Sequence, residues 1–197
     1  RRRMDFHHIK NIVQTQHTLH ENEWKGAVLF LCNDEYVYFI KRSEKMPTHG
    51  GQLAFVGGHK KPSENDPWES AQREFEEETG LERVNIEFLG YLPVVMTARM
   101  QPIVPVLSKL LITSDEFFEK VKSNGEWDDM IAYPWSRLIK EESWEFAWRN
   151  GYSRGPVMFH PIQKGTFRPL NNGFETHLLW GATASMVWDF LRLYYRE

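Results

Sequence analysis

The chain has 197 residues, of which 41% are hydrophobic and 26% are charged, and its formal net charge is −3. These values are typical of a globular protein with one main domain, and the small charge gives no reason to expect a nucleic-acid or anionic-membrane partner. No apolar run approaches the roughly 20 residues needed to cross a bilayer, and no signal peptide follows the basic first residues, so we expect a cytoplasmic protein without a membrane segment.

Residues 1–22 are expected to form a helical extension, followed by the main domain over residues 23–197. Residues 5–21 are polar, with apolar side chains at mixed helical spacing. This pattern predicts a helix that packs on the body of the protein or on a partner subunit.

Two strands joined by a tight turn are predicted next. Trp24–Cys32 is an apolar run, Asn33-Asp34 is a turn signal, and Glu35–Lys41 returns as a second strand. The single cysteine, Cys32, lies in the apolar run and is expected to be buried rather than to act as a nucleophile. Residues 42–51 have the composition of a loop.

A strand over Gln52–Val56 leads into the glycine pair Gly57-Gly58 and then into a short helix. Asp66 suits the N-cap of this helix, Pro67 its first position, and Gly80 the left-handed position that ends it. The apolar face with which the helix can pack on a sheet consists of Trp68, Ala71 and Phe75.

A second face of the same helix carries Glu74, Glu77 and Glu78 at positions i, i+3 and i+4. Like charges at this spacing destabilise a helix, and a bound cation would compensate for the repulsion. Carboxylate oxygens suit hard divalent ions, and Mg²⁺ takes a few carboxylates together with phosphate and water. The pattern therefore predicts a site for Mg²⁺, or Mn²⁺, on a solvated helix face; a purely structural acidic helix is the alternative.

The rest of the chain continues the alternation of strands and helices. The prolines of Gln101–Leu111 predict a strand at a sheet edge or at a bulge. Gly90 predicts a bulge and Ser114 predicts a helix cap. Residues 93–100 and 144–152 show no clear helix or strand pattern. The predicted elements are strands over Val84–Leu92, Gln101–Leu111 and Gly155–Ile162, and helices over Asp115–Val121, Trp135–Glu142 and the last part of His177–Tyr195.

Residues 73–81, Arg-Glu-Phe-Glu-Glu-Glu-Thr-Gly-Leu, resemble the core of the Nudix box, and Gly58 and Glu64 resemble its start. The gap from Glu64 to Arg73 is one residue longer than in the general box and is similar to that of the coenzyme A pyrophosphatase subgroup. The resemblance implies an α/β/α sandwich with a central mixed β-sheet and the box helix packed on it.

The resemblance also implies hydrolysis of a nucleoside diphosphate linked to another moiety, with Mg²⁺ or Mn²⁺ as cofactor. The metal ligands that it implies are Glu74, Glu77 and Glu78. Arg73 would orient these glutamates and pair with Glu64. Glu77 is the first choice for the residue that accepts the proton of the attacking water, and Glu126 and Asp128 are alternatives.

Two further segments resemble the same subgroup. Arg42–Phe55 is similar to its second signature, although Pro47 replaces an arginine and Val56 replaces a proline. Trp180–Ala184 is similar to a segment that precedes a terminal helix. Coenzyme A or a derivative is therefore the first substrate choice; ADP-ribose or another nucleoside diphosphate sugar is the alternative that Pro47 favours. The alternative from a different functional class is a catalytically silent protein of the same fold that senses a nucleotide.

Several side chains are candidates for substrate contacts. The expected substrate-binding residues are Arg42, Gly57, Gly58 and Arg99, of which the glycines would let the backbone approach phosphate or metal closely. Tyr91, Trp127 and Trp148 either stack on adenine or belong to the core. Similar proteins are commonly homodimers, so a second copy of the chain is a possible partner, and the sequence leaves the oligomeric state open.

Overall fold

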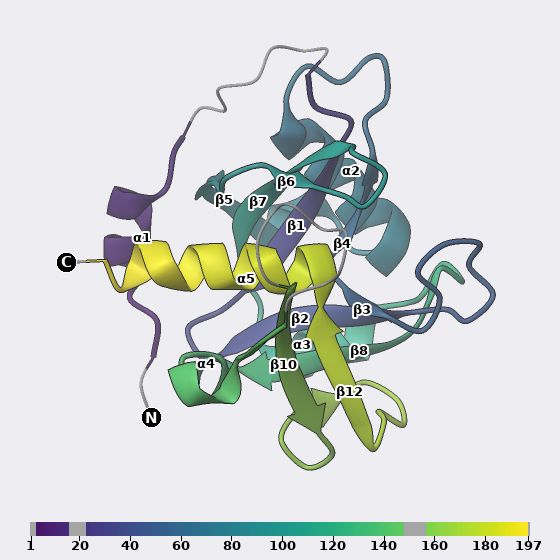
Figure 1. Ribbon diagram of the computed structural model, residues 1–197. Helices are drawn as coiled ribbons and strands as arrows, with labels where there is room; N and C mark the ends of the chain where they lie inside the picture. Colours follow the sequence, from purple (N-terminus) through teal and green to yellow (C-terminus); the bar gives the residue numbers. More distant parts are fainter. Residues whose placement is uncertain (1–2, 16–22, 148–156, 197) are drawn as a thin grey trace.

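The computed structural model describes residues 3–15, 23–147 and 157–196 (Figure 1). The strands are β1 (Gly26–Cys32), β2 (Tyr36–Arg42), β3 (Leu53–Ala54), β4 (Val56–His59), β5 (Ile86–Tyr91), β6 (Val95–Met96), β7 (Pro102–Leu110), β8 (Trp127–Pro134), β9 (Glu145–Ala147), β10 (Val157–Gln163), β11 (Arg168–Pro169) and β12 (Thr176–Trp180). The helices are α1 (Phe6–Ile12), α2 (Pro67–Thr79), α3 (Ser114–Lys120), α4 (Trp135–Leu138) and α5 (Gly181–Tyr194), with 3₁₀ turns at Arg83–Asn85 and Glu141–Ser143.

The central sheet is mixed and has the strand order β11-β8-β2-β1-β7-β5. β1 and β2 form the predicted antiparallel hairpin, whereas β1 and β7 run parallel along their whole length. β4 pairs with β1 in the antiparallel sense and brings Gly57 opposite Val28 and Gly58 opposite Ala27. A separate antiparallel sheet has the order β12-β10-β9.

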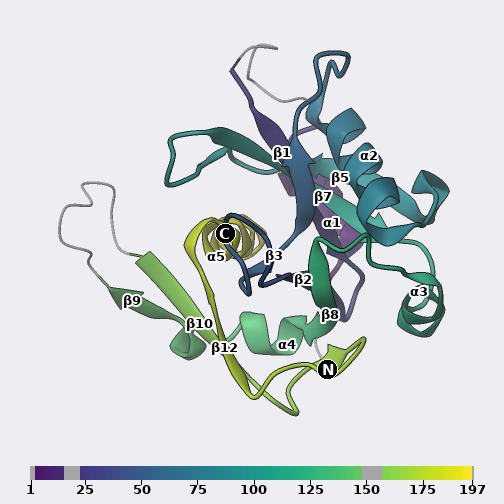
Figure 2. The same ribbon diagram turned by 90° about the vertical axis from the view of Figure 1, so that its right-hand side faces the viewer.

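Helices cover both faces of the central sheet, as Figure 2 shows for α2 and α3 on one side and α5 on the other. Successive residues of a strand point to opposite faces, so Leu29 and Leu31 pack with Phe75 of α2, whereas Phe30 packs with Phe190 of α5. The predicted α/β/α sandwich is therefore confirmed.

Strand β7 lies between β1 and β5, so the edge position predicted as one alternative is wrong, whereas its pairing with β5 does contain a bulge. Pro105 is tolerated there for a local reason. The N–H of Leu92 donates to the Pro105 carbonyl at 3.0 Å. The nitrogen and the carbonyl of a strand residue point to the same side, so the missing N–H of Pro105 faces the break between β5 and β6 and costs no ladder bond.

Other local predictions were right in part. The bulge at Gly90 is confirmed by the register shift between β5 and β7. Thr113, and not Ser114, caps α3, because the Thr113 hydroxyl accepts from the Glu116 N–H. The helix predicted from residue 135 to 142 ends at Leu138 and is followed by a 3₁₀ turn.

The described part of the N-terminal segment packs on the body of the protein. Asp5 caps α1, Ile9 is fully buried, and Gln14 forms a β-bridge with Tyr91. The predicted helix over 5–21 is thus confirmed only to Ile12, and residues 16–22 lie outside the described ranges.

Cys32 is fully buried at the end of β1, where its thiol faces the Ser108 carbonyl at 3.7 Å. Burial raises the pKa of this thiol far above its ordinary value. In the three described ranges, no helix combines the length and the apolar character that crossing a lipid bilayer requires.

Candidate active site

Helix α2 is set in place by its own ends. The Asp66 carboxylate accepts from the Glu69 N–H at 2.9 Å, and the Glu69 carboxylate accepts from the Asn65 N–H at 2.8 Å. Pro67 occupies the first turn, and Gly80 ends the helix with φ at +73°. The helix therefore begins and ends where its sequence predicts, which fixes the rotation of its glutamates.

Arg73 is the centre of the hydrogen-bond network on α2. Its Nε donates to Glu64 at 2.9 Å, and its Nη1 donates to Glu74 at 2.7 Å and to Glu77 at 3.0 Å. Nη2 donates to the His59 carbonyl at 2.9 Å. One guanidinium group thus joins the last residue of β4 to three carboxylates.

Glu64 is buried and fully engaged. In addition to Arg73, the Lys61 N–H donates to the Glu64 carboxylate at 2.7 Å, and the Ser70 hydroxyl donates to it at 3.0 Å. Burial opposes ionisation of Glu64, but these hydrogen bonds and the Arg73 charge outweigh it and hold its pKa below the ordinary value. Glu64 is therefore a fixed anion that orients Arg73.

Glu74 and Glu78 are buried against the glycine pair, with exposed fractions of 8% and 2%. The Gly57 N–H donates to Glu78 at 3.0 Å. A Cβ atom at Gly58 would lie 2.3 Å from a Glu74 carboxylate oxygen, so a larger residue there would displace this carboxyl group. The prediction of a solvated acidic face is wrong for these two residues, because β4 covers them.

Burial controls the charge of these two carboxyl groups. It raises the pKa of Glu78 to about 9. The hydrogen bond from Gly57 lowers this pKa, whereas the neighbouring Glu74 and Glu126 raise it further. Burial also raises the pKa of Glu74, although Arg73 opposes it. Two carboxyl groups that interact directly and resist ionisation form a donor set that a divalent cation would satisfy.

No three carboxylate, imidazole or thiol groups of the described residues already converge as a metal site. Arg73 instead binds oxygens of Glu74 and Glu77. The side chain of Glu77 is 47% exposed, and its second oxygen accepts from Lys61 at 3.2 Å. The carboxylates present therefore have the chemistry to bind a divalent ion. In this structure their positively charged partners are Arg73, which pairs with Glu74 and Glu77, and Lys61, which pairs with Glu77.

Glu126 reaches the same region from the loop before β8. It is half-buried, and its charge acts on both Glu74 and Glu78. The Ser123 hydroxyl and the Asn124 side chain accept from the Gly125 and Glu126 N–H groups, at 3.0 Å each. Glu126 is thus presented by an ordered turn.

Arg42 lies at the end of β2, next to this turn. The Ser43 N–H donates to the Glu126 carbonyl at 2.9 Å, and Arg42 Nη2 donates to the Thr48 carbonyl at 3.3 Å. Within the described residues, the buried Nε of Arg42 has no acceptor. An arginine with a spare buried donor next to the Glu126 turn could bind an anionic ligand.

The remaining candidates lie elsewhere. Arg99 is exposed in the turn between β6 and β7, Asp128 is exposed on β8, and within the described residues neither contacts the glutamates. The base-stacking role is wrong for Tyr91 and Trp127, which are 7% and 2% exposed and belong to the core. Trp148 lies outside the described residues.

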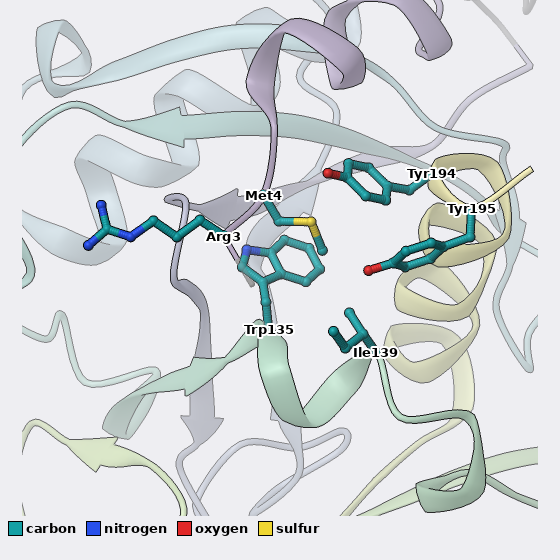
Figure 3. A pocket seen from close by; sticks show the side chains of 6 residues that line it. All are labelled: Arg3, Met4, Trp135, Ile139, Tyr194 and Tyr195. Carbon is teal, nitrogen blue, oxygen red and sulfur yellow. The ribbon is translucent and has the colours of Figure 1, made fainter. Parts of the chain in front are cut away.

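Figure 3 shows a cavity of about 340 Å³ at another place in the fold. It lies where the N-terminal segment meets α4 and the last turn of α5, and it contains none of the predicted site residues. The side chains that line it are Arg3, Met4, Trp135, Ile139, Tyr194 and Tyr195. Arg3 is already paired with Asp34 and Glu35, so this cavity adds nothing to the acidic site.

Comparison with known proteins places this chain among relatives of one family. A model of the NUDIX domain matches residues 23–135, more than half of the chain. Nudix hydrolase 15 (mitochondrial) of Arabidopsis thaliana is 24% identical over 169 residues, which are 83% of this chain and 56% of that protein. The mitochondrial coenzyme A diphosphatase of Homo sapiens is 26% identical over 159 residues, which are 80% of this chain and 61% of that protein.

The chain thus spans little more than half the length of these curated relatives. A crystal structure of a MutT/nudix family protein from Enterococcus faecalis has a TM-score of 0.50 at 18% identity, over 90% of this chain and 65% of that one. This likeness concerns the fold.

Proposed function

This chain belongs to the NUDIX domain family, and we propose that it is a divalent-metal-dependent pyrophosphohydrolase. It would cleave the diphosphate of a nucleotide-containing small molecule. The observation that carries the proposal is the pair of buried carboxyl groups of Glu74 and Glu78 against the Gly57-Gly58 backbone. Such a pair has no evident structural value unless a cation joins it.

Glu74, Glu77 and Glu78 would hold the ion, whose chemistry is to neutralise diphosphate charge and to lower the pKa of water. Mg²⁺ is the first choice and Mn²⁺ the second, because the donors are all oxygen atoms. Arg73, fixed by Glu64, would keep Glu74 and Glu77 in place when the site is loaded. The Gly57-Gly58 backbone would support the site by packing directly against the carboxyl groups of Glu78 and Glu74.

The proton of the attacking water needs an acceptor at the same place. Glu77 is exposed enough to meet water, but both of its oxygens accept from cations, Arg73 and Lys61. Glu126 makes no such pair within the described residues and acts electrostatically on Glu74 and Glu78. We keep Glu77 as first choice and Glu126 as the second candidate base.

Coenzyme A or a derivative is the first substrate choice. The support is the match of Arg42–Phe55 to the subgroup signature, together with the name of the human relative. The spare donor of Arg42 suits a phosphate of such a substrate. Pro47 is exposed in the same loop and supplies no cation, which favours ADP-ribose or another nucleoside diphosphate sugar as the second candidate.

The test incubates the protein with coenzyme A, ADP-ribose and a nucleoside diphosphate sugar at equal concentrations, and separates the products by chromatography. With Mg²⁺ we expect adenosine bisphosphate and phosphopantetheine from coenzyme A as the fastest reaction. Glu78→Gln is the matched control, because it removes one ligand while keeping the volume of the side chain. Faster cleavage of ADP-ribose would move the assignment to the second substrate class.

No turnover of any substrate, with Mg²⁺ binding and nucleotide binding retained, would instead support a nucleotide-sensing fold. A protein that binds neither would contradict the whole proposal. Calorimetric titration with Mg²⁺ separates these two results.

A further inference from the structure

The loop of residues 43–51, between β2 and β3, is closed by backbone contacts. The Gly51 N–H donates to the Arg42 carbonyl and the Arg42 N–H to the Gln52 carbonyl, both at 2.9 Å. The Ser43 N–H donates to the Glu126 carbonyl, also at 2.9 Å. These bonds tie the loop to Arg42 and to Glu126, which the pairing of β2 with β8 already brings together by placing Arg42 opposite Trp127.

His177 of β12 adds a contact from a distant part of the sequence. Its Nε2 lies 2.6 Å from the Gly51 carbonyl oxygen, and its Nδ1 lies 3.2 Å from the Leu178 carbonyl oxygen. A carbonyl only accepts, so Nε2 carries the proton in the short contact. The ring of Phe174 packs edge-on against the imidazole, with centroids 5.2 Å apart.

The held residue, Gly51, has little freedom of its own. Its φ is +74°, and a Cβ atom there would lie 2.5 Å from a Glu44 carboxylate oxygen. The loop is thus closed at a residue whose positive φ favours glycine, and His177 binds the carbonyl of that residue.

The segment that carries His177 is itself anchored on β8. The buried Asp129 carboxylate accepts from the Asn171 N–H at 2.8 Å and from the Gly173 N–H at 2.6 Å. From there the chain passes into β12, which contacts β3 and continues into α5 (Figure 1). The anchor lies on the strand that starts directly after Glu126.

We propose that His177 is a positioning residue for substrate binding, which acts through Gly51 on Arg42. This inference rests on the proposed function, in which Arg42 binds a phosphate of the substrate. His177 lies beyond residues 23–135, so the NUDIX match does not assign it a role. Since the metal ligands and the first-choice base, Glu77, lie on α2, we expect loss of His177 to change substrate affinity and to leave the chemical step unchanged.

The test compares His177→Ala, His177→Gln and the control His8→Ala. His8 makes the same kind of contact, from Nε2 to the Tyr194 carbonyl at 2.8 Å, at the far end of α5. That helix has 14 residues and is about 20 Å long. We expect His177→Ala to raise KM about three- to tenfold, the range for one lost hydrogen bond, with kcat within about twofold of wild type.

His177→Gln, which can place an amide N–H near the position of Nε2, is expected to restore most of the affinity, and His8→Ala to leave KM unchanged. Hydrogen exchange at the Ser43 and Gly51 amides is expected to be faster in His177→Ala, with exchange in α2 unchanged. An unchanged KM, or a loss confined to kcat, would overturn the inference.

A wild-type protein that hydrolyses none of the three substrates would reject the proposed function separately. The inference is then decided by the dissociation constant of ADP-ribose, which must be larger in His177→Ala than in wild type and in His8→Ala. An equal dissociation constant in all three proteins would overturn it.

Discussion

The indole N–H of Trp127 donates to the backbone carbonyl of Glu78 at 2.8 Å, and both side chains are buried. This bond joins the end of α2 to the first residue of β8, directly after Glu126. The spacing between the buried glutamates and the Glu126 turn is therefore set by a core tryptophan that no box motif contains.

Trp127→Phe is expected to destabilise the fold by about 1–3 kcal/mol, because it leaves a buried carbonyl without a donor. The measurement is the urea midpoint, with an unchanged m-value as the sign of an intact fold. Trp68→Phe is the control, since Trp68 is half-buried and its indole N–H has no acceptor among the described residues. Equal midpoints for the two variants would argue against the role of this bond.

Arg73→Met is expected to cost about 3 kcal/mol at neutral pH, because the buried carboxylate of Glu64 loses its partner. The folded-state pKa of Glu64 lies below its ordinary value of 4.5, so the stability from this group is present above that pH and is lost as the pH falls through the folded-state pKa. The difference between variant and wild type should therefore shrink in acid, as measured by urea unfolding across pH. Lys120→Met, which removes an exposed pair with Glu116, should cost less than about 0.5 kcal/mol at every pH.

The raised pKa of Glu78 predicts that its contribution to the stability of the fold has the opposite pH dependence. Its pKa of about 9 means that the folded chain holds this proton more tightly than the unfolded chain, so the metal-free fold loses stability as the pH rises from the ordinary value towards 9. An ion that replaces the proton should raise Tm more at about pH 9 than at about pH 6. Thermal melts with and without Mg²⁺ measure this, and Glu78→Gln should abolish the pH-dependent part. A pH-independent shift in wild type would contradict the assigned ligand.

Glu77→Gln and Glu126→Gln together locate the proton acceptor. Loss of a general base lowers kcat by about 10²- to 10⁴-fold, and both side chains are exposed enough for the fold to survive the change. We expect the larger loss in Glu77→Gln, measured as kcat at saturating Mg²⁺ with circular dichroism as the check on folding. A larger loss in Glu126→Gln would transfer the role to the turn before β8.

Local sequence signals predicted the elements around the site well. Asp66, Pro67 and Gly80 act within one or two turns of the chain, so the bounds of α2 could be predicted without the rest of the fold. The burial of Glu74 and Glu78 could not be predicted in this way, because it depends on β4 pairing with β1 and bringing Gly57-Gly58 over the helix.

Non-local contacts explain the other misses. Trp127 was open to two interpretations because an aromatic residue fits a core or a nucleobase equally well until its neighbours are known. The central position of β7 was missed because Pro105 is tolerated only where β5 and β6 leave a break. His177 carries no motif, and its contact with Gly51 spans 126 positions of the chain.

The burial of Cys32 gives the protein an internal reporter of its own motions. The chain has one cysteine, so a thiol reagent has a single target and needs no engineered label. That target is inaccessible, and its thiolate is disfavoured, for as long as β1 stays between β2 and β7. The rate of labelling at neutral pH therefore reports how often β1, the strand with which β4 and its glycine pair are paired, opens. A ligand that binds at those glycines should slow the labelling.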